Sequence, residues 1–472
     1  MRTERLVPLI VAVALFMENT DSTVIATSLP AIAADLSTSP LTLKLAVTSY
    51  LLSLAVFIPA SGWTADRFGA RNVFRTAMAV FIAGSLICAA STSLTTFVLG
   101  RIVQGAGGAM MTPVGRLLLL RTVDKKDLVN AMAWLTIPAL IGPVIGPPLG
   151  GFITTYASWH WIFLINVPVG LIGIALATRF IPDVRAELLD PIDLHGLILS
   201  GVAIAGLAFG LSVAGLGLLP VPFVLTLLIV GTIAAFGYAR HSRRTATPVL
   251  DFSLLALPTF RANLVGGSLF RIGVGAMPFL LPLLMQLGFG LTPLQSGLIT
   301  FSSALGSMAM KFVASPILRR FGFKRILVPN AVISGAFIAS CAAFTPGTPI
   351  ALIIAVLIAG GFFRSLEFTC ISTIAYADVE PRLMSRATTL VSVAQQLAIS
   401  VGVAVAALIV EFVARSSPEA TLTAADFSPA FLIVGAMSAA AALLFATLPA
   451  DAGAQLSGRV APTPGDPEKP VA

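Results

Sequence analysis

Charged residues are scarce in this chain of 472 residues. Asp, Glu, Lys and Arg make up only 11% of it, whereas hydrophobic residues make up 57%, and the mean hydropathy is +0.96. Soluble globular domains carry about 25% charged residues and cannot bury apolar side chains in this proportion. The composition therefore excludes a soluble globule and predicts a polytopic membrane protein whose partner is the lipid bilayer.

Cysteine and histidine are also rare. The three cysteines all fall in apolar runs, so we expect buried thiols and no disulfide framework. The three histidines fall near loops or span ends without ligand spacing, and we expect no metal site. No Walker-type Gly-x-x-x-x-Gly-Lys-Ser/Thr, His-Glu-x-x-His or Gly-x-Ser-x-Gly segment occurs. We therefore expect neither ATP-driven transport, nor an enzyme, nor a cofactor.

Long apolar runs dominate what is present. A bilayer-spanning helix needs about 20 mostly apolar residues, and fourteen runs qualify: 6–34, 44–65, 73–92, 94–120, 131–154, 161–180, 194–214, 221–239, 262–287, 294–315, 326–344, 350–376, 387–412 and 428–449. The first run lacks a small-residue cleavage site, so we interpret it as a retained helix rather than a signal peptide. An even number of spans places both termini on one side.

The basic residues indicate which side that is. The formal net charge of +8 comes from Lys and Arg that gather in the termini and the even-numbered loops. The opposite side holds only Lys44 and Arg415. Cytoplasmic loops collect Lys and Arg, so the asymmetry predicts an N-in, C-in protein of the bacterial inner membrane, and the basic charge needs no nucleic acid as partner.

Short sequence pairs recur at one constant offset. The pairs are Pro40-Leu41 with Pro293-Leu294, Arg67-Phe68-Gly69 with Arg320-Phe321-Gly322, Cys88-Ala89-Ala90 with Cys341-Ala342-Ala343, and Gly107-Gly108 with Gly360-Gly361. This register predicts a parallel repeat, as found in transporters whose substrate site lies between two halves. We expect an all-α fold with an N-terminal six-helix half (1–180), a segment with two inserted helices (181–260), a C-terminal six-helix half (261–450) and a disordered cytoplasmic tail (451–472).

Three segments carry small and charged residues in a motif-like pattern. The loop after the second run contains Gly62, Asp66, Arg67, Gly69 and Arg71, where a charged turn that follows the positive-inside rule is the plainer alternative. The fourth run contains Arg101 and Gln104 beside a glycine face. The fifth run contains Gly142, Pro143, Gly146 and Gly150, for which close helix packing is the plainer alternative.

These segments resemble motifs A, B and C of the major facilitator superfamily. The segment from Asp21 to Pro30 resembles the first-helix motif of drug:proton antiporters. The segment from Ser158 to Pro168 resembles the one before span six in the fourteen-span EmrB/QacA branch, and within that branch the chain looks most like MdtD-type exporters. Thr27 and Gln395 depart from the usual family residues, asparagine and arginine.

The resemblance implies a major facilitator fold that exports amphipathic small molecules against protons by rocker-switch alternating access, functional as a monomer. It assigns gating to the segment with Gly62, Asp66, Arg67, Gly69 and Arg71, and the antiporter motif to Gly142, Pro143, Gly146 and Gly150. Substrate identity and charge stay open. The alternatives are export of a specific metabolite or organic anion, or a transport-inactive membrane sensor.

Ionisable residues inside the apolar runs are costly, so each is a functional hypothesis. Glu18 and Asp21 lie three residues apart on one helix face, so we expect them to share proton coupling with Arg101 and to tolerate neutral replacement. Alternatively, Asp21 only forms hydrogen bonds with its neighbours.

Four further residues are expected to line the substrate cavity: Arg271, Arg364, Gln104 and Gln395. The repeat makes Arg271 the equivalent of Glu18, which predicts an ion pair across the pathway, with a lone anion-binding Arg271 as the alternative. Arg364 and Glu367 are expected to pair within one helix.

Overall fold

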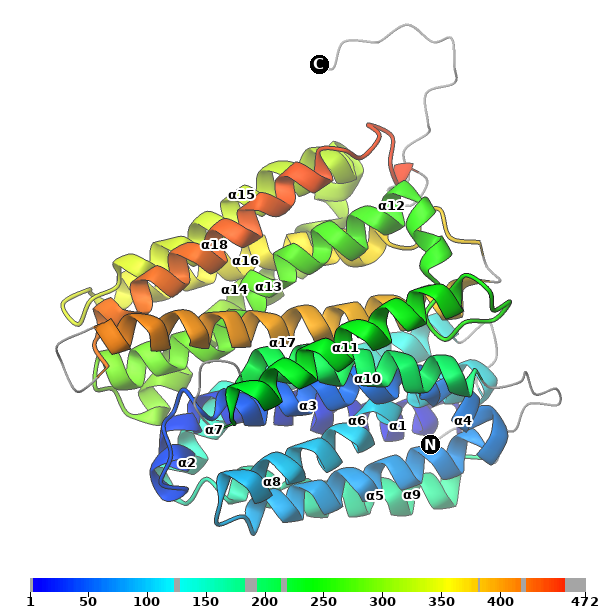
Figure 1. Cartoon of the computed structure of the whole chain (residues 1–472), viewed down its shortest axis with the longest axis horizontal. Helices are drawn as coiled ribbons and strands as arrows, with labels where there is room; N and C mark the ends of the chain where they lie inside the picture. The colour runs from blue at the N-terminus through cyan, green and yellow to red at the C-terminus, as the bar shows by residue number, and fades with distance from the viewer. Residues whose placement is uncertain are drawn as a thin grey trace, which may run out of the picture.

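The computed structural model describes residues 3–122, 128–182, 193–213, 219–380, 383–416 and 422–454. These residues form helices and connecting turns, with no strand among them. Figure 1 shows the long helices running roughly side by side, with the start of α1 and the end of α18 toward the same end of the bundle. Of the tail expected to be disordered, residues 455–472 lie outside the described part of the chain.

The helices follow the apolar runs closely. The first group comprises α1 (Thr3–Val24), α2 (Leu29–Asp35), α3 (Lys44–Phe57), α4 (Ser61–Phe68), α5 (Ala70–Ala89), α6 (Leu94–Thr122), α7 (Leu128–Tyr156), α8 (Trp161–Leu164) and α9 (Asn166–Phe180). Next come α10 (Leu194–Val213) and α11 (Val221–Ser242). The last group comprises α12 (Pro258–Arg261), α13 (Gly267–Leu283), α14 (Pro293–Phe321), α15 (Phe323–Ser340), α16 (Ile350–Ile374), α17 (Met384–Ser416) and α18 (Ala424–Phe445).

Twelve helical segments among the described residues are long and apolar enough to cross a membrane. The sequence predicts fourteen spans, and this number is not confirmed. The two expected spans outside the twelve are 94–120 and 131–154, which coincide with α6 and α7. Both are helices of 29 residues. The first expected span, 6–34, is interrupted after Val24 by a 3₁₀ turn at Ile25–Thr27 before the short helix α2.

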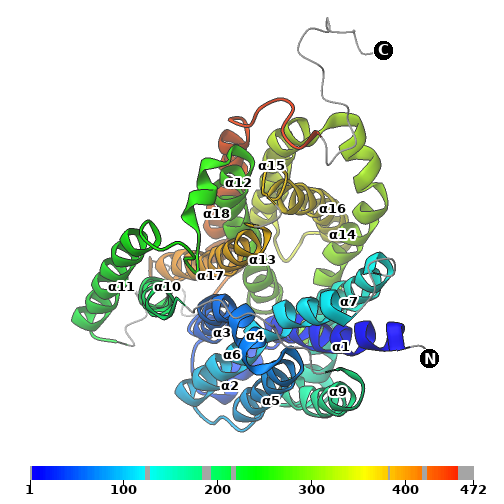
Figure 2. The same cartoon turned by 90° about the vertical axis from the view of Figure 1, so that its right-hand side faces the viewer.

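The bundle divides into two groups of helices. α1 packs on α7 and α9, and α5 packs on α6, whereas α13 packs on α17, α14 on α16 and α15 on α18. Figure 2 looks along the bundle and shows α1 to α9 on one side and α13 to α18 on the other. The two groups touch where α3 meets α17 and where α7 meets α14. α10 and α11 lie beside this boundary, with α10 against α3 and α17.

The turn after each repeated Arg-Phe-Gly has the same backbone conformation. Gly69 ends α4 with a φ of 86°, and Gly322 ends α14 with a φ of 76°. Glycine adopts positive φ without the steric cost that a Cβ imposes. The repeat found in the sequence therefore corresponds to one local structure formed twice, at the start of α5 and of α15.

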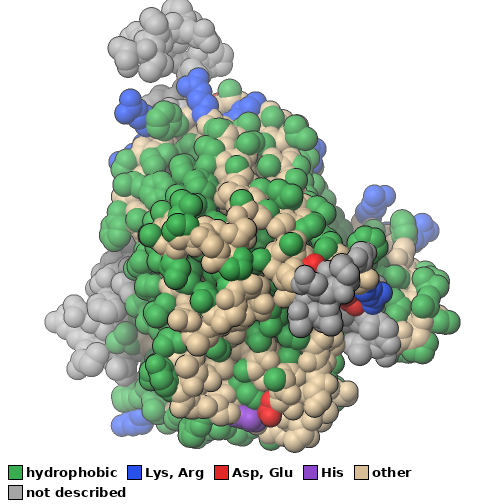
Figure 3. Space-filling view, turned by 90° about the vertical axis from the view of Figure 1, so that its left-hand side faces the viewer, with side chains coloured by type: hydrophobic (Ala, Val, Ile, Leu, Met, Phe, Trp, Pro, Cys, Tyr) green, Lys and Arg blue, Asp and Glu red, His purple; other side chains and the backbone are tan. Residues whose placement is uncertain are grey.

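The outer surface is apolar. On α11, the side chain of Phe236 is 75% exposed and that of Ile233 is 65% exposed, as suits a helix that faces lipid. Figure 3 views the bundle from the left-hand side of Figure 1, and hydrophobic side chains cover much of the face it shows. Cys88, Cys341 and Cys370 are buried free thiols, as predicted.

Candidate functional site

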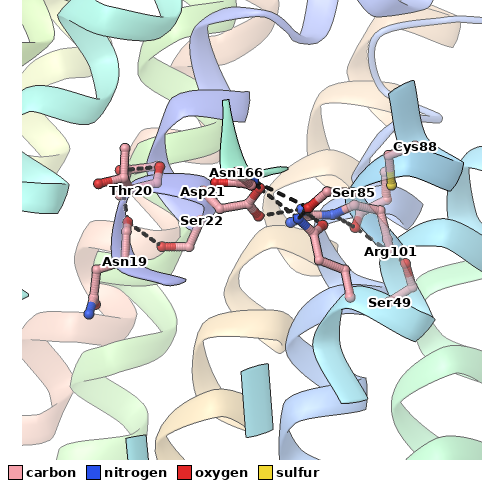
Figure 4. Close-up of polar contacts among 12 residues, drawn as sticks. Asn19, Thr20, Asp21, Ser22, Ser49, Ser85, Cys88, Arg101 and Asn166 are labelled. Atoms are coloured by element: carbon pink, nitrogen blue, oxygen red, sulfur yellow. Dashed lines mark hydrogen bonds and ion pairs between the residues drawn. The ribbon is translucent and has the colours of Figure 1, made fainter. Parts of the chain in front are cut away.

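Asp21 is the centre of a buried polar network inside the first helix group. Its side chain, on α1, is 2% exposed. Arg101 Nη1 donates to Asp21 Oδ2 at 2.6 Å, Gln104 Nε2 donates to Oδ1 at 2.8 Å, and Asn166 Nδ2 donates to Oδ1 at 3.0 Å. Figure 4 shows Asp21 pointing toward Arg101, Ser85 and Asn166. Donors from α6 and α9 thus converge on one carboxylate of α1.

Arg101 is held on several sides at once. It is 1% exposed, its Nη1 also donates to Gln104 Oε1 at 2.6 Å, and its Nε donates to the Ala46 carbonyl of α3 at 3.2 Å. Its guanidinium lies 4.2 Å from the centre of the Tyr50 ring. A buried charge is stable only when it is paired and hydrogen-bonded, so Asp21 and Arg101 depend on each other.

Glu18 belongs to a different contact. Thr112 Oγ1 of α6 donates to Glu18 Oε2 at 2.7 Å, and the Glu18 side chain is only half-buried. Glu18 and Asp21 therefore have different partners, although they are three residues apart on α1. Among the expected coupling residues, the structure brings Asp21 and Arg101 together and places Glu18 one turn away.

The four residues expected to line the substrate cavity do not meet in one place. Gln104 belongs to the Asp21 network, whereas Arg271, Arg364 and Gln395 lie on α13, α16 and α17 of the other helix group. Gln395 is half-buried on α17. The four residues thus come from both helix groups, and their lining of one substrate cavity stays a prediction.

Arg271 is buried without a hydrogen-bonding partner. It is 1% exposed, and none of its three side-chain nitrogens has a hydrogen bond within the described part of the chain. Its guanidinium lies 5.3 Å from the centre of the Phe368 ring. The predicted ion pair with Glu18 is consequently not formed in this structure.

The predicted ion pair between Arg364 and Glu367 is also wrong. Arg364 Nη2 donates to Ser303 Oγ of α14 at 2.6 Å, whereas Glu367 Oε2 accepts from Asn330 Nδ2 of α15 at 2.8 Å. Residues three apart on a helix are close enough to pair. Here α14 and α15 lie on different sides of α16, and each supplies a nearer partner.

The glycines of the antiporter motif pack α7 against α1. A Cβ at Gly146 would lie 2.9 Å from Thr23 Cβ, and one at Gly142 would lie 2.9 Å from Thr20 Oγ1. A Cβ at Gly150 would lie 2.7 Å from Thr27 Oγ1. The stripe thus allows close helix approach. The side chain of Pro143 lies outside the described part.

The segment expected to act in gating spans the end of α4 and the start of α5. Asp66 and Arg67 lie in the last turn of α4, and Gly69 forms the turn. Arg71 Nη1 donates to the Ile181 carbonyl just after α9 at 3.3 Å. This hydrogen bond stays within the first helix group.

Contacts between the two helix groups include three near the end of the bundle farther from the N-terminus of α1. Gln286 Nε2 donates to the Thr27 carbonyl at 2.9 Å, and the Leu294 N–H donates to Thr155 Oγ1 at 3.2 Å. Lys44 Nζ lies 4.0 Å from Glu411 Oε2. Thr27 follows α1 directly, so the segment that carries Asp21 also touches the opposite group.

Sequence reasoning missed several members of these networks. Ser85 Oγ accepts from both Gln104 and Asn166, at 2.8 and 3.3 Å. Asn330 was also not singled out. The missed residues, Ser85, Asn166 and Asn330, are polar and lie in apolar runs. The rule that identified Arg101 would have found them had it included uncharged polar residues.

Comparison with known proteins agrees with this arrangement of helices. The family model described as Major Facilitator Superfamily matches residues 11–260 and 263–467. The chain belongs to the major facilitator superfamily. Members of this superfamily are transporters, and no catalytic family is indicated for the chain.

Within the superfamily, the chain is similar to proteins provisionally named multidrug resistance protein MdtD. It is 38% identical to that of Pectobacterium atrosepticum over 94% of this chain and 95% of the relative, and 37% identical to that of Yersinia enterocolitica over the same shares. The Klebsiella pneumoniae protein is 38% identical over 94% of each chain.

Solved transporters share the fold. The crystal structure of a D-xylose-proton symporter superimposes with a TM-score of 0.68 at 16% identity, covering 95% of this chain and 98% of that one. The inward open conformation of the xylose transporter XylE from E. coli gives a TM-score of 0.63 at 15% identity, covering 93% and 95%. At these identities the likeness establishes the major facilitator fold alone.

Proposed function

We propose that this transporter exports amphipathic small molecules from the bacterial cytoplasm in exchange for protons, by rocker-switch alternating access. The observation that carries the proposal is the buried Asp21–Arg101 pair, whose N–O distance is 2.6 Å. An ionisable pair inside a membrane bundle is costly to keep and marks a proton or substrate pathway. The multidrug names of the relatives support the substrate class.

The pair offers a physical route from protonation to conformational change. A proton on Asp21 removes the negative charge that Arg101 neutralises, so the attraction between α1 and α6 weakens. α1 leads directly into Thr27, whose carbonyl accepts from Gln286 of the opposite helix group. A change at Asp21 therefore biases the contact between the two groups, as a two-state transporter requires.

The remaining site residues take supporting roles in this proposal. Glu18 is a second carboxylate of the coupling helix. The segment with Gly62, Asp66, Arg67, Gly69 and Arg71 gates the cytoplasmic side, and Gly142, Pro143, Gly146 and Gly150 keep α1 close to α7. Because Asp66→Asn removes a charge at that gate, it should favour the inward-open state.

The proposed topology is N-in and C-in, with fourteen spans and a functional monomer in the inner membrane. The distribution of Lys and Arg supports the orientation. α6 and α7 are included because a helix of 29 residues is about 44 Å long, which exceeds a hydrocarbon core of about 30 Å. The proposed divisions are 1–180, 181–260, 261–450 and 451–472.

A second candidate function is export of an organic anion. Arg271 favours it, because the side-chain nitrogens of this buried guanidinium have no hydrogen-bonding partner in the described part of the chain. A carboxylate or sulfonate on the substrate would supply the acceptors that the guanidinium lacks. In this candidate, Arg364 and Gln395 contribute polarity to the same half.

Transport by the purified protein in proteoliposomes tests the proposal. A pH gradient imposed across the membrane should drive uptake of at least one compound from a panel of cationic dyes, biocides and organic acids. Asp21→Asn should abolish this pH-driven uptake while substrate exchange without a gradient survives. Asp35→Asn is the matched control, since its side chain is 55% exposed, and it should behave as the wild type.

Two results would contradict the proposal, and a third would favour the second candidate function. Full pH-driven uptake by Asp21→Asn would remove this carboxylate from coupling. Absence of transport for the whole panel, with a folded protein and either gradient direction, would favour the transport-inactive sensor. Preference for the organic acids, lost in Arg271→Gln, would favour the anion exporter over the cationic-drug exporter.

A further inference from the structure

A second buried acid lies in the C-terminal helix group, far along the chain from Asp21. Glu367 on α16 is 0% exposed. Its Oε2 accepts from Asn330 Nδ2 at 2.8 Å, but among the described residues neither its Oε1 nor Asn330 Oδ1 has a hydrogen-bonding partner. Two groups that already touch therefore each keep one buried oxygen without a donor.

No described cation pairs with this carboxyl group. On α14, Lys311 donates to Thr369 at 3.0 Å, and Arg364 of α16 itself donates to Ser303 of α14. On α13, Arg271 lies over the Phe368 ring. α18, which packs on α15, has one charged residue, Asp426, which accepts from Thr423 at the helix start. The other titratable neighbour is the buried thiol of Cys370 on α16 itself.

An ionised carboxylate here would be poorly compensated. Asn330 offers one neutral donor to Glu367, since its Nδ2 also donates to the Phe363 carbonyl at 2.9 Å. Burial of a charge without a partner costs far more than burial of a neutral, hydrogen-bonded group, and such groups take up or lose a proton instead. The surroundings therefore favour the neutral acid.

We propose that Glu367 is a second proton-binding site of this transporter and carries its proton in the conformation described. A proton on Oε1 supplies the donor that Asn330 Oδ1 lacks, so that the acid and the amide exchange two hydrogen bonds head to head. One added proton thereby satisfies both orphan oxygens. Its release and uptake during transport rest on the proposed function, whereas its presence does not.

The internal repeat shows that packing alone does not require this polar pair. The register that equates Gly69 with Gly322 and Gly107-Gly108 with Gly360-Gly361 also equates Asn330 with Ala77 and Glu367 with Val114. Ala77 and Val114 are 4% and 1% exposed in the apolar core. The N-terminal half thus fills the equivalent place with apolar side chains.

A small pocket lies one helical turn from the pair. It is lined by Ser303, Ser334 and Arg364 among others. Ser334 follows Asn330 by one helical turn on α15, and none of the described residues forms a hydrogen bond with its hydroxyl. Arg364 precedes Glu367 by one turn on α16. The pocket therefore borders both helices that carry the acid and the amide.

Infrared spectroscopy of the purified full-length protein tests the protonation state directly. A neutral carboxyl group has a C=O stretch that an ionised one lacks, and this band shifts in D₂O. Glu367→Gln should remove one such component, and it should stay folded because the amide has nearly the same shape. Glu411→Gln, which changes an acid that already has Arg415 as a partner at 2.8 Å, should leave the component in place.

A second variant tests the acid–amide pairing. Asn330→Leu should leave the component present but move it to higher frequency, because the C=O of Glu367 loses its donor. An unchanged carboxyl region in Glu367→Gln at neutral pH would mean that Glu367 is ionised and would overturn the proposal. An Asn330→Leu spectrum identical to that of the wild type would overturn the pairing and with it the stated reason for protonation.

Proton counting connects the site to transport. A pH indicator should register fewer protons released per substrate bound in Glu367→Gln than in the wild type. An unchanged count would show that Glu367 is no exchanging site, even if its band is present. This test distinguishes the second site from the proposed function. If Asp21→Asn loses coupling and Glu367→Gln keeps the wild-type proton count, the proposed function is supported and the second site is rejected.

Discussion

At the scale of single residues, the decisive feature is that Asp21 and Arg101 neutralise each other. Both are almost fully buried, and their side chains form an ion pair at 2.6 Å. The sequence grouped both in proton coupling, but it did not predict that their side chains form a direct ion pair. The expectation that neutral replacement of Asp21 is harmless consequently changes, since such a replacement leaves Arg101 unpaired.

We therefore predict that Asp21→Asn destabilises the protein by about 3–5 kcal/mol, the usual cost of breaking a buried ion pair from one side. The double variant Asp21→Asn with Arg101→Gln should recover most of that loss, because no uncompensated charge remains. Thermal unfolding in detergent measures both. Equal melting temperatures for the wild type and the single variant would mean that the pair contributes nothing to stability.

Arg364 and Glu367 show the opposite case, because here the sequence predicted an ion pair that the structure does not form. Sequence spacing indicates which side chains of one helix are neighbours. It contains no information about which helices flank them, and here Ser303 of α14 and Asn330 of α15 are the partners. Intrahelical spacing is therefore a weak guide where a buried charge has polar neighbours on adjacent helices.

At the scale of elements, α1 and α7 are joined through a stripe without side chains. Gly142, Gly146 and Gly150 face the stretch of α1 and its following turn from Thr20 to Thr27. Small residues at this spacing let two helix backbones approach closely. Such close packing stabilises helix association in a membrane, where lipid tails are as apolar as the side chains and the hydrophobic effect does not drive it. The structure therefore shows close helix packing at this motif, which was the plainer of the two interpretations of the sequence.

Gly146→Val should weaken this contact. Even the first carbon of the new side chain would lie 2.9 Å from Thr23 Cβ and 3.3 Å from the Val24 nitrogen. Overpacking of this kind costs about 1–3 kcal/mol. Gly237→Ala on α11 is the control, since its nearest neighbour would lie at 3.6 Å. Melting temperatures that fall equally in both variants would reject the stripe as the cause.

A second element-scale feature joins α10, α11 and the segment after them. Asp193 accepts from the Gly196 N–H at 2.8 Å, from His241 Nε2 at 2.6 Å and from the Val249 N–H at 3.3 Å. Burial raises the pKa of Asp193, but the hydrogen bonds from Gly196 and His241 together lower it by more than burial raises it. The pKa therefore lies below its usual value. The ionised form is thus the one that holds these segments together.

The resulting pH dependence has a definite sign. A carboxyl group with a lowered folded-state pKa contributes stability above its unfolded value of about 4 and loses it as the pH falls through the folded value. Asp193→Asn should therefore melt below the wild type at pH 7, and the difference should shrink as the pH falls below the usual carboxyl value of about 4. A difference that stays constant over this pH range would exclude the charge of Asp193 as the cause.

At the scale of the whole molecule, the two helix groups are in contact through few polar links. Lys44 of α3, 0% exposed, lies 4.0 Å from Glu411 of α17, and Gln286 reaches the Thr27 carbonyl. Alternating access requires that contacts between the halves break at one end and form at the other. These links therefore stabilise the conformation described relative to one that is open at this end.

We predict that Lys44→Gln shifts the population toward the state open at this end. Loss of an ion pair of about 1 kcal/mol changes the ratio of the two states roughly fivefold.

Spin labels on cysteines introduced at the exposed loop positions Ser39 and Thr345 should show a larger fraction of long distances. Lys311→Gln is the matched control, since Lys311 donates to Thr369 within one half. An unchanged distance distribution in Lys44→Gln would show that this link does not hold the end closed.

The sequence by itself determined the membrane class, nearly all helix positions and the internal repeat. Each of these follows from local chemistry: about 20 apolar residues must cross a bilayer as a helix, and Gly69 and Gly322 repeat one turn. The family motifs around Asp66, Arg101 and Gly146 were recognised from adjacent residues in the same way.

Only the tertiary structure decided which polar groups pair. Asp21 and Arg101 meet across two helices, Arg271 finds no acceptor among the described residues, and Glu367 accepts from Asn330 rather than from Arg364. Each buried polar group requires a partner wherever one can be reached. Reach depends on helix rotation and on which helices are neighbours, and both are fixed by side-chain packing between segments far apart in the sequence.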